Sequence, residues 1–237
     1  LLARRPQADE MTIIREGADR LRRYLASRQW PNVEVTNTDR ILIASMTTIA
    51  GEALPFHFVI LSDSFSSQQL LETTIHELLH RYEGLPIQWM DEGLTELIAT
   101  LARISTEPSP MRASGSSAPY GVRTAIAQRL LPYAAGGPVS QRLVSEVGPE
   151  EPTLNEYLPF VILLEHLFIT VLPRRGISLE VVLRAYRDGA WPEMVARFGP
   201  EAIVLLEAID DMAGQLPREG LHLVREVERA QAREVGR

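Results

Sequence analysis

The sequence predicts an α+β fold in which a small mixed sheet and a pair of helices precede a helical C-terminal half. Two observations carry this prediction. Short apolar runs between residues 33 and 61 have the length and alternation of strands, whereas from Ser66 onward apolar residues recur at three- and four-residue spacing, as in helices. A chain of 237 residues, of which 45% are hydrophobic, has ample material for a core.

The first hundred residues are expected to hold one helix followed by three strands. Residues 8–29 predict an amphipathic helix, because apolar side chains recur along one face: Met11, Ile14, Ala18, Leu21 and Leu25. Three strands are then expected, around Val33–Val35, Ile41–Met46 and Pro55–Leu61, with turns at residues 37–39 and near Gly51. The predicted sheet is therefore small.

Two helices joined by a short turn follow the strands. Ser66 and Gln69 have the spacing of a capping box, so a helix is expected from Ser66 to about Tyr82. Gly84 and Pro86 end it, since glycine accepts a left-handed conformation and proline cannot continue a helix. A second helix is expected over residues 90–103.

The clearest boundary in the chain is the stretch 105–121, which is rich in Ser, Pro and Gly. We therefore predict an α/β subdomain at residues 1–104, a loop at 105–121, and a helical subdomain at 122–237 that closes a cleft. Helices in that last part are expected at residues 122–133, 153–172, 178–187, 191–198, 200–214 and 218–235.

Composition excludes several classes of protein. Without cysteine there is no disulfide scaffold and no thiolate chemistry. The net charge of −7 argues against a nucleic-acid partner, which would favour a basic face. No apolar run is long enough to span a membrane; the longest, Phe160–Leu172, is interrupted by Glu165 and His166.

The first residue is Leu1 rather than methionine, which indicates that an upstream segment has been removed. A signal peptide, a membrane anchor and a cloning boundary would each account for it. An extracytoplasmic or membrane-tethered location is the expectation among these.

The pattern H-E-x-x-H at residues 76–80 is the strongest chemical signal in the sequence. Histidines four residues apart lie on one face of a helix, so His76 and His80 can reach a single ion. Glu77 projects from the edge of that face, where it can meet a water on the metal. Two imidazoles, one carboxylate and an open fourth position suit Zn²⁺.

The next helix supplies the missing carboxylate. Glu92 and Glu96 are again four residues apart, and a short connection places their helix antiparallel to the first. Glu92 is the predicted third ligand. Glu96 is predicted to accept the free ring N–H of a ligating histidine and so to fix its tautomer.

With these residues the sequence resembles the gluzincin metallopeptidases, the superfamily of thermolysin and the zinc aminopeptidases. Their third ligand lies in a phrase like W-L-N-E-G-F-A-E, and residues 89–96 read W-M-D-E-G-L-T-E. The short linker between the two motifs is similar to a compact branch of the superfamily. The motif-level resemblance covers about residues 56–103.

The resemblance implies a strand near Phe56–Leu61 that runs along the cleft edge and pairs with an extended peptide. It also implies a tyrosine or histidine beside the zinc that stabilises the oxyanion. Tyr157 is the best match and His166 is its rival; Tyr120 and Tyr133 remain open. His57 and His222 have no partners by spacing and are expected to be structural.

The function expected from these residues is a zinc-dependent metallopeptidase that cleaves a peptide or protein substrate with a metal-activated water, Glu77 acting as general base. The alternative is a gluzincin-like module that binds peptide or protein and is latent or inactive. It is motivated by residues 51–54, which read G-E-A-L where zinc aminopeptidases carry an amine-binding G-x-M-E-N phrase. Hydrolysis of a non-peptide amide or ester is a third option.

Overall fold

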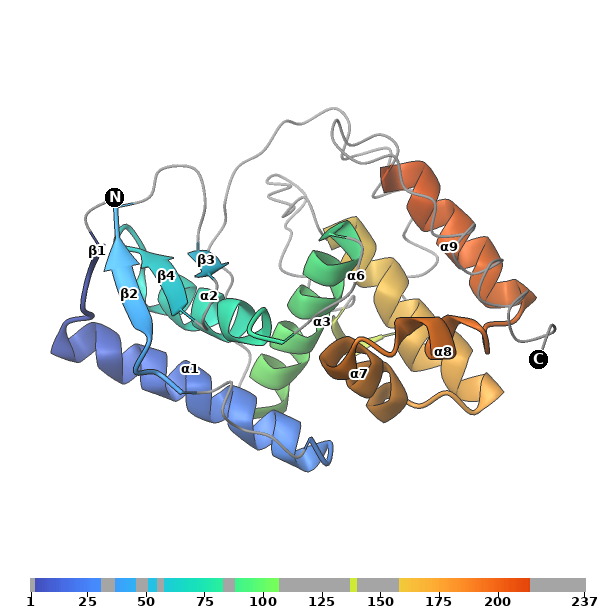
Figure 1. Ribbon diagram of the computed structural model, residues 1–237, viewed down its shortest axis with the longest axis horizontal. Coiled ribbons are helices and arrows are strands. Elements are labelled where there is room, and N and C mark those ends of the chain that lie inside the picture. The colour runs from blue at the N-terminus through green and yellow to red at the C-terminus, as the bar shows by residue number, and fades with distance from the viewer. Residues whose placement is uncertain are drawn as a thin grey trace. The chain divides into compact units, whose positions relative to one another are not determined.

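The computed structural model describes residues 3–30, 37–45, 51–54, 58–82, 88–106, 137–139 and 158–213. They form a small sheet and mostly helices, which confirms the predicted α+β class (Figure 1). The chain divides into two compact units: an N-terminal unit, Leu1–Tyr82 with Ile98–Ser114, and a helical unit, Glu83–Leu97 with Gly115–Arg237. The predicted division at a loop over residues 105–121 stays a prediction, because residues 107–121 lie outside the described ranges.

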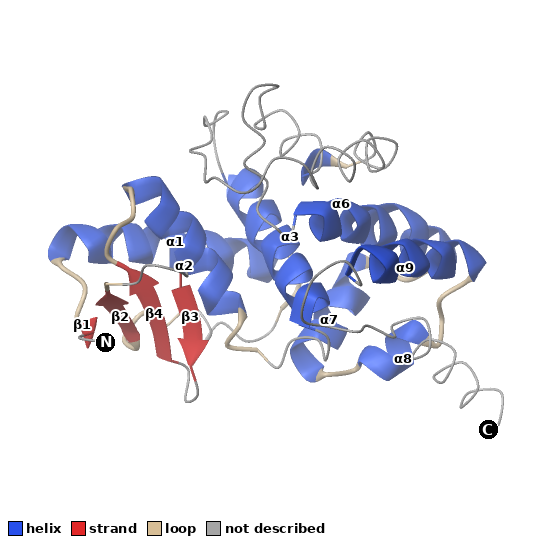
Figure 2. Cartoon of the chain, turned by 90° about the horizontal axis from the view of Figure 1, so that it is seen from above, coloured by secondary structure: helices blue, strands red, loops and turns tan. Residues whose placement is uncertain are grey.

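The sheet of the N-terminal unit has, within the described residues, four strands in the order β1-β2-β4-β3 (Figure 2). Their bounds are Ala3–Arg4 for β1, Ile41–Ala44 for β2, Gly51–Leu54 for β3 and Phe58–Ser62 for β4. β2 and β4 are parallel, whereas β1 and β3 run antiparallel to their neighbours, so the sheet is mixed. Ile41 faces Val59 and Ile43 faces Leu61; all four are buried, which places this face of the sheet in the core.

Two expectations about the sheet were wrong. The turn predicted near Gly51 is instead strand β3, in which Gly51 lies opposite Leu61 of β4. The strand that the resemblance places along the cleft edge, near Phe56–Leu61, corresponds to β4, which lies inside the sheet with both edges paired, to β2 and to β3. The edge strands of the described sheet are β1 and β3. The predicted strand around Val33–Val35 lies outside the described residues.

Helices α1 (Ala8–Ser27) and α2 (Ser67–Leu79) cover the sheet from one side (Figure 2). α1 packs on α2, and α2 packs on β3 and β4. The apolar face predicted for α1 is confirmed, because Ile14, Ala18, Leu21 and Leu25 are buried. Only Met11 of that predicted face is partly exposed.

Helix α2 begins as predicted and ends earlier. The Ser66 side chain accepts a hydrogen bond from the Gln69 N–H, and the Gln69 side chain accepts from the Ser66 N–H, which completes the capping box. The α-helix ends at Leu79 with His80 as its C-cap, and the next residues form a tighter turn. This turn is tied to α1 and its surroundings: Arg81 donates to the Asn37 carbonyl, and the Tyr82 ring contacts Trp30.

Helix α3 (Gln88–Thr106) extends beyond the predicted range 90–103 at both ends. Further helices follow in the helical unit: α6 (Leu158–Glu165), the π-helix η3 (His166–Val171), the 3₁₀ helix η4 (Leu172–Arg175), α7 (Leu179–Asp188), α8 (Trp191–Val195) and α9 (Pro200–Ala213). They enclose a core that includes Phe160, Phe168, Tyr186 and Leu206.

Of the single helix predicted over residues 153–172, the described part is helical throughout but changes type twice, and residues 153–157 lie outside the described ranges. Gly176 then takes a left-handed conformation, with φ of 74°, and ends the segment. The helices predicted at 122–133 and 218–235 lie outside the described residues. In the part of the chain that the structure describes, no helix is long and apolar enough to cross a bilayer.

The capping box of α2 provides a direct test of this fold. Ser66→Ala removes the acceptor of the Gln69 N–H and is expected to lower the free energy of unfolding by about 1 kcal/mol. Ser67→Ala is the matched control, because Ser67 is an exposed residue of the first turn that does not cap the helix. Urea denaturation of the two variants measures the difference, and equal midpoints would contradict the capping assignment.

Candidate metal centre

The two histidines of the H-E-x-x-H pattern meet at the C-terminal end of α2, where His76 lies in the last turn and His80 is the C-cap. Their Nε2 atoms lie 3.1 Å apart and their ring centroids 4.8 Å apart. At that separation one ring can donate its N–H to the other, or both lone pairs can bind one cation. Two donors bound to one tetrahedral zinc at about 2.0–2.1 Å lie about 3.3 Å from each other, so His76 and His80 match such a pair.

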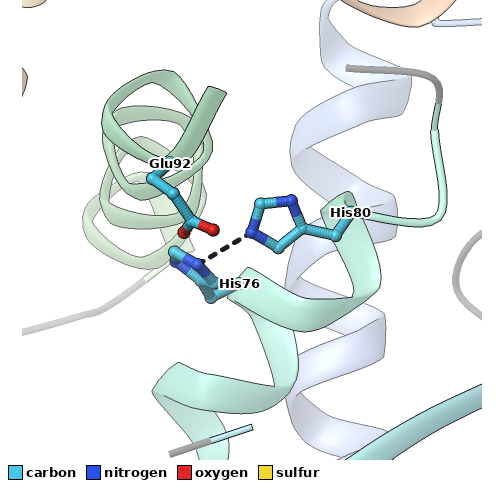
Figure 3. Close-up of side chains that lie close together, drawn as sticks. All are labelled: His76, His80 and Glu92. Atoms are coloured by element: carbon cyan, nitrogen blue, oxygen red, sulfur yellow. Dashed lines mark hydrogen bonds between the residues drawn. The ribbon is translucent and has the colours of Figure 1, made fainter. Parts of the chain in front are cut away.

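The third member of the site is Glu92 on α3. One ligand atom each from His76, His80 and Glu92 lies within 4.8 Å of the other two, and all three side chains are partly buried. Figure 3 shows the Glu92 carboxylate directed toward the two imidazole rings. Among the described residues, this is the group of His, Cys, Asp and Glu side chains that can hold one metal ion.

Glu77, the predicted general base, is nearly buried, with 7% of its surface exposed. Its side chain lies against Gly51 of β3: a Cβ added at Gly51 would come within 2.6 Å of the Glu77 Cγ and 2.8 Å of its Oε1. The glycine is therefore required by a close approach between strand and side chain rather than by a turn. This is the physical reason for the wrong prediction at Gly51.

Glu96 lies one turn beyond Glu92 on α3 and is partly buried. Residues four apart share a helix face, so Glu96 is on the side of α3 that carries Glu92. The hydrogen bond from a ligating histidine to Glu96 stays a prediction.

The candidate oxyanion donor Tyr157 lies outside the described residues, as do Tyr120 and Tyr133. His57 and His222, expected to be structural, are outside them too.

His166, the rival of Tyr157, is the first residue of η3 and is partly buried. Burial is the main cause of a lowered pKa of the His166 imidazole. The negative charges of Glu201 and Glu165 raise this pKa, and the positive charge of Arg174 lowers it. A neutral imidazole is therefore favoured at this position.

Tyr186, a fully buried residue of α7, is a further residue near the site that the sequence patterns do not predict. Its hydroxyl oxygen lies 2.7 Å from the Thr95 Oγ1, three residues after Glu92. Burial raises the pKa of Tyr186 well above its usual value, and the carboxylates of Asp91 and Glu92 raise it further. The available signal was a single tyrosine in the otherwise aliphatic stripe of α7 formed by Leu179, Val182 and Leu183.

A second unpredicted contact joins α2 and α3. Arg103 of α3 donates to the Glu72 carboxylate of α2, and only 10% of the Arg103 side chain and 31% of the Glu72 side chain are exposed. Glu72 lies one turn before His76. Arg103 lies eleven residues after Glu92, about three turns, and so returns to nearly the same face of α3. The ion pair therefore marks the faces of the two helices that also carry the metal-site residues.

Comparison of the chain with models of protein families, with curated proteins and with solved structures finds no match.

The Glu72–Arg103 ion pair is expected to contribute more than an exposed pair. A double-mutant cycle of Glu72→Gln and Arg103→Gln should give a coupling energy of about 1–2 kcal/mol, because both groups are largely removed from water. The control cycle uses Asp19 and Arg22, an i,i+3 pair on α1 whose side chains are 43% and 51% exposed, which is expected to couple by about 0.2–0.5 kcal/mol. Urea unfolding of both cycles measures the energies, and the same small coupling in each would contradict the prediction.

Proposed function

We propose that the chain is a zinc-dependent metallopeptidase of the gluzincin type. The observation that carries this proposal is the convergence of His76, His80 and Glu92 on one point, with Glu77 next to the first ligand in the chain. The resemblance of residues 89–96 to the third-ligand phrase of gluzincins adds to it. A group of this kind with no catalytic purpose would have no need of Glu77.

Zinc suits the three donors better than the common alternatives. Imidazole nitrogens and one carboxylate oxygen are usual zinc ligands, and three protein ligands with an open fourth position are typical of catalytic rather than structural zinc sites. Magnesium and calcium favour sites made of oxygen atoms. His76, His80 and Glu92 would hold the ion.

A zinc ion in such a site supplies a Lewis acid and lowers the pKa of water to near neutrality. Glu77 then acts on protons: its carboxylate accepts a proton from the attacking water and returns it to the leaving amine nitrogen. Contact with Gly51 holds the Glu77 side chain in place. Restricting that side chain in advance lowers the entropy that would be lost in reaching the reactive geometry.

Strand β3 is suited to bind the substrate backbone. It is the last strand of the sheet order, so one of its edges faces no other strand among the described residues. An extended peptide that paired with this edge would present its carbonyl groups beside Gly51, and hence beside Glu77. Recognition of this kind reads main chain, which fits a peptide or protein substrate.

The proposal predicts one zinc per chain and chelator-sensitive peptide cleavage. His76→Ala or Glu92→Ala should lose bound zinc, because two remaining ligands hold it weakly. Glu77→Gln should keep zinc and lose turnover by about 10²–10⁴-fold, because the amide cannot accept the proton. Metal analysis of the purified chain and digestion of a broad peptide library, with and without chelator, are the measurements.

His222→Ala is the control for metal content, because His222 is predicted to be structural. Wild-type turnover by Glu77→Gln would contradict the role given to Glu77. Zinc binding with an intact peptide library would favour the alternative, a module that binds peptide or protein without cleaving it. Cleavage that chelator abolishes excludes that alternative.

Gly51→Ala tests the positioning of Glu77. The added methyl group would overlap the Glu77 side chain and displace its carboxylate, while the three metal ligands keep their places. We expect kcat to fall at least tenfold with zinc content unchanged. Turnover at the wild-type rate, or a loss of zinc that accounts for the loss of turnover, would contradict this account.

A further inference from the structure

The phenol hydroxyl of Tyr186 is a polar group in an apolar interior. It belongs to α7, and the rest of the Tyr186 side chain packs in the core of the helical unit. A phenylalanine would fill nearly the same volume without a hydroxyl group. Burial of a hydroxyl group costs substantial free energy unless the group is hydrogen-bonded. The partners of this hydroxyl therefore indicate what it does.

Those partners lie on the turn of α3 that carries Glu92. The Tyr186 hydroxyl is 2.7 Å from the Oγ1 of Thr95, which is itself fully buried, and it also hydrogen-bonds the Asp91 side chain. Asp91 and Thr95 are four residues apart and share one face of α3. Glu92 follows Asp91 directly and therefore projects about 100° around the helix axis.

The hydroxyl groups and the carboxylate form a chain with one consistent direction. A carboxylate oxygen accepts a hydrogen bond, so the phenol O–H donates to the Asp91 side chain. The Thr95 hydroxyl can then donate to the phenol oxygen. One buried group thus joins a residue just before Glu92 to a residue three positions after it.

Gly93 limits the same turn from another direction. A Cβ added at Gly93 would lie 2.9 Å from the Leu164 Cδ1 and 3.0 Å from the Phe160 Cβ, so α3 and α6 approach closely there. Contacts at residues 91, 93 and 95 together restrict rotation and sliding of α3.

We propose that Tyr186 is a positioning residue of the metal centre, which sets the direction of Glu92 by holding Asp91 and Thr95. This inference rests on the proposed function, because it presumes that Glu92 binds a metal. It gives the D-E-G-x-T sequence at residues 91–95 a physical reading: Glu92 is the ligand and three of its neighbours orient it.

The test measures zinc affinity by competition with a chromophoric chelator, on the full chain. Tyr186→Phe keeps the ring and removes the hydroxyl, and we expect it to weaken zinc binding by about 10–100-fold, the usual effect of removing a group that orients a ligand. Tyr24→Phe is the matched control: it removes a buried phenol hydroxyl from α1 and is expected to leave zinc affinity unchanged. Unfolding of each zinc-free variant is measured in parallel, so that affinity is compared only under conditions where all variants are folded.

Thr95 provides a second pair of variants. Thr95→Val has nearly the same shape without the hydroxyl and should weaken zinc binding, whereas Thr95→Ser keeps the hydroxyl and should stay near wild type. A purely structural role for these residues would change the stability of the zinc-free chain and leave the affinity of the folded chain unaltered.

The outcomes separate the inference from the proposed function. If Tyr186→Phe binds zinc as tightly as wild type while His76→Ala does not bind it, the positioning role is overturned and the metal centre stands. Equal losses in Tyr186→Phe and Tyr24→Phe, or in Thr95→Ser and Thr95→Val, also overturn the role. A wild-type chain that binds no zinc overturns both the inference and the proposed function.

Discussion

The candidate metal centre depends on one geometric constraint, the direction in which α3 projects Glu92. The histidine pair needs little tertiary help, because one turn of α2 brings the two Nε2 atoms to 3.1 Å. The position of a carboxylate on a different helix is not set by local helix geometry and depends on tertiary contacts. A rotation of α3 by a single residue position would turn it about 100° away. The buried polar contacts of α3 are best understood as the means by which this rotation is set.

These contacts differ in kind along the helix. Near its start, Asp91 and Thr95 are held by the phenol of Tyr186, and Gly93 allows close packing against α6. Near its end, Arg103 forms an ion pair with Glu72 of α2. Hydrogen bonds and ion pairs with little exposure are directional, whereas apolar packing tolerates small slides. Directional contacts are therefore suited to a helix whose rotation must place one carboxylate at a fixed position.

The parts of the structure that could be predicted from the sequence are those set by local spacing. The capping box at Ser66, the buried face of α1 and the histidine pair all depend on residues three or four positions apart. β3 could not be predicted, because a glycine among short apolar runs indicates a turn. Glycine is required at position 51 because the Glu77 side chain of α2 lies against it, and that contact is not visible in the neighbouring sequence. The early end of α2 has a similar origin in contacts of Arg81 and Tyr82 with distant residues. Tyr186 is 91 residues from Thr95, and the aliphatic stripe around Tyr186 singles out the tyrosine without identifying Thr95 as its partner.

The continuity of α3 between Glu92 and Arg103 limits how this chain can vary in length. Insertion or deletion of one residue in that stretch would leave the site residues themselves unchanged. It would nevertheless rotate the two ends of the helix by about 100° relative to each other. Loops elsewhere absorb such changes at little cost. We therefore expect related chains to tolerate many substitutions between these two positions while keeping the number of residues between them constant.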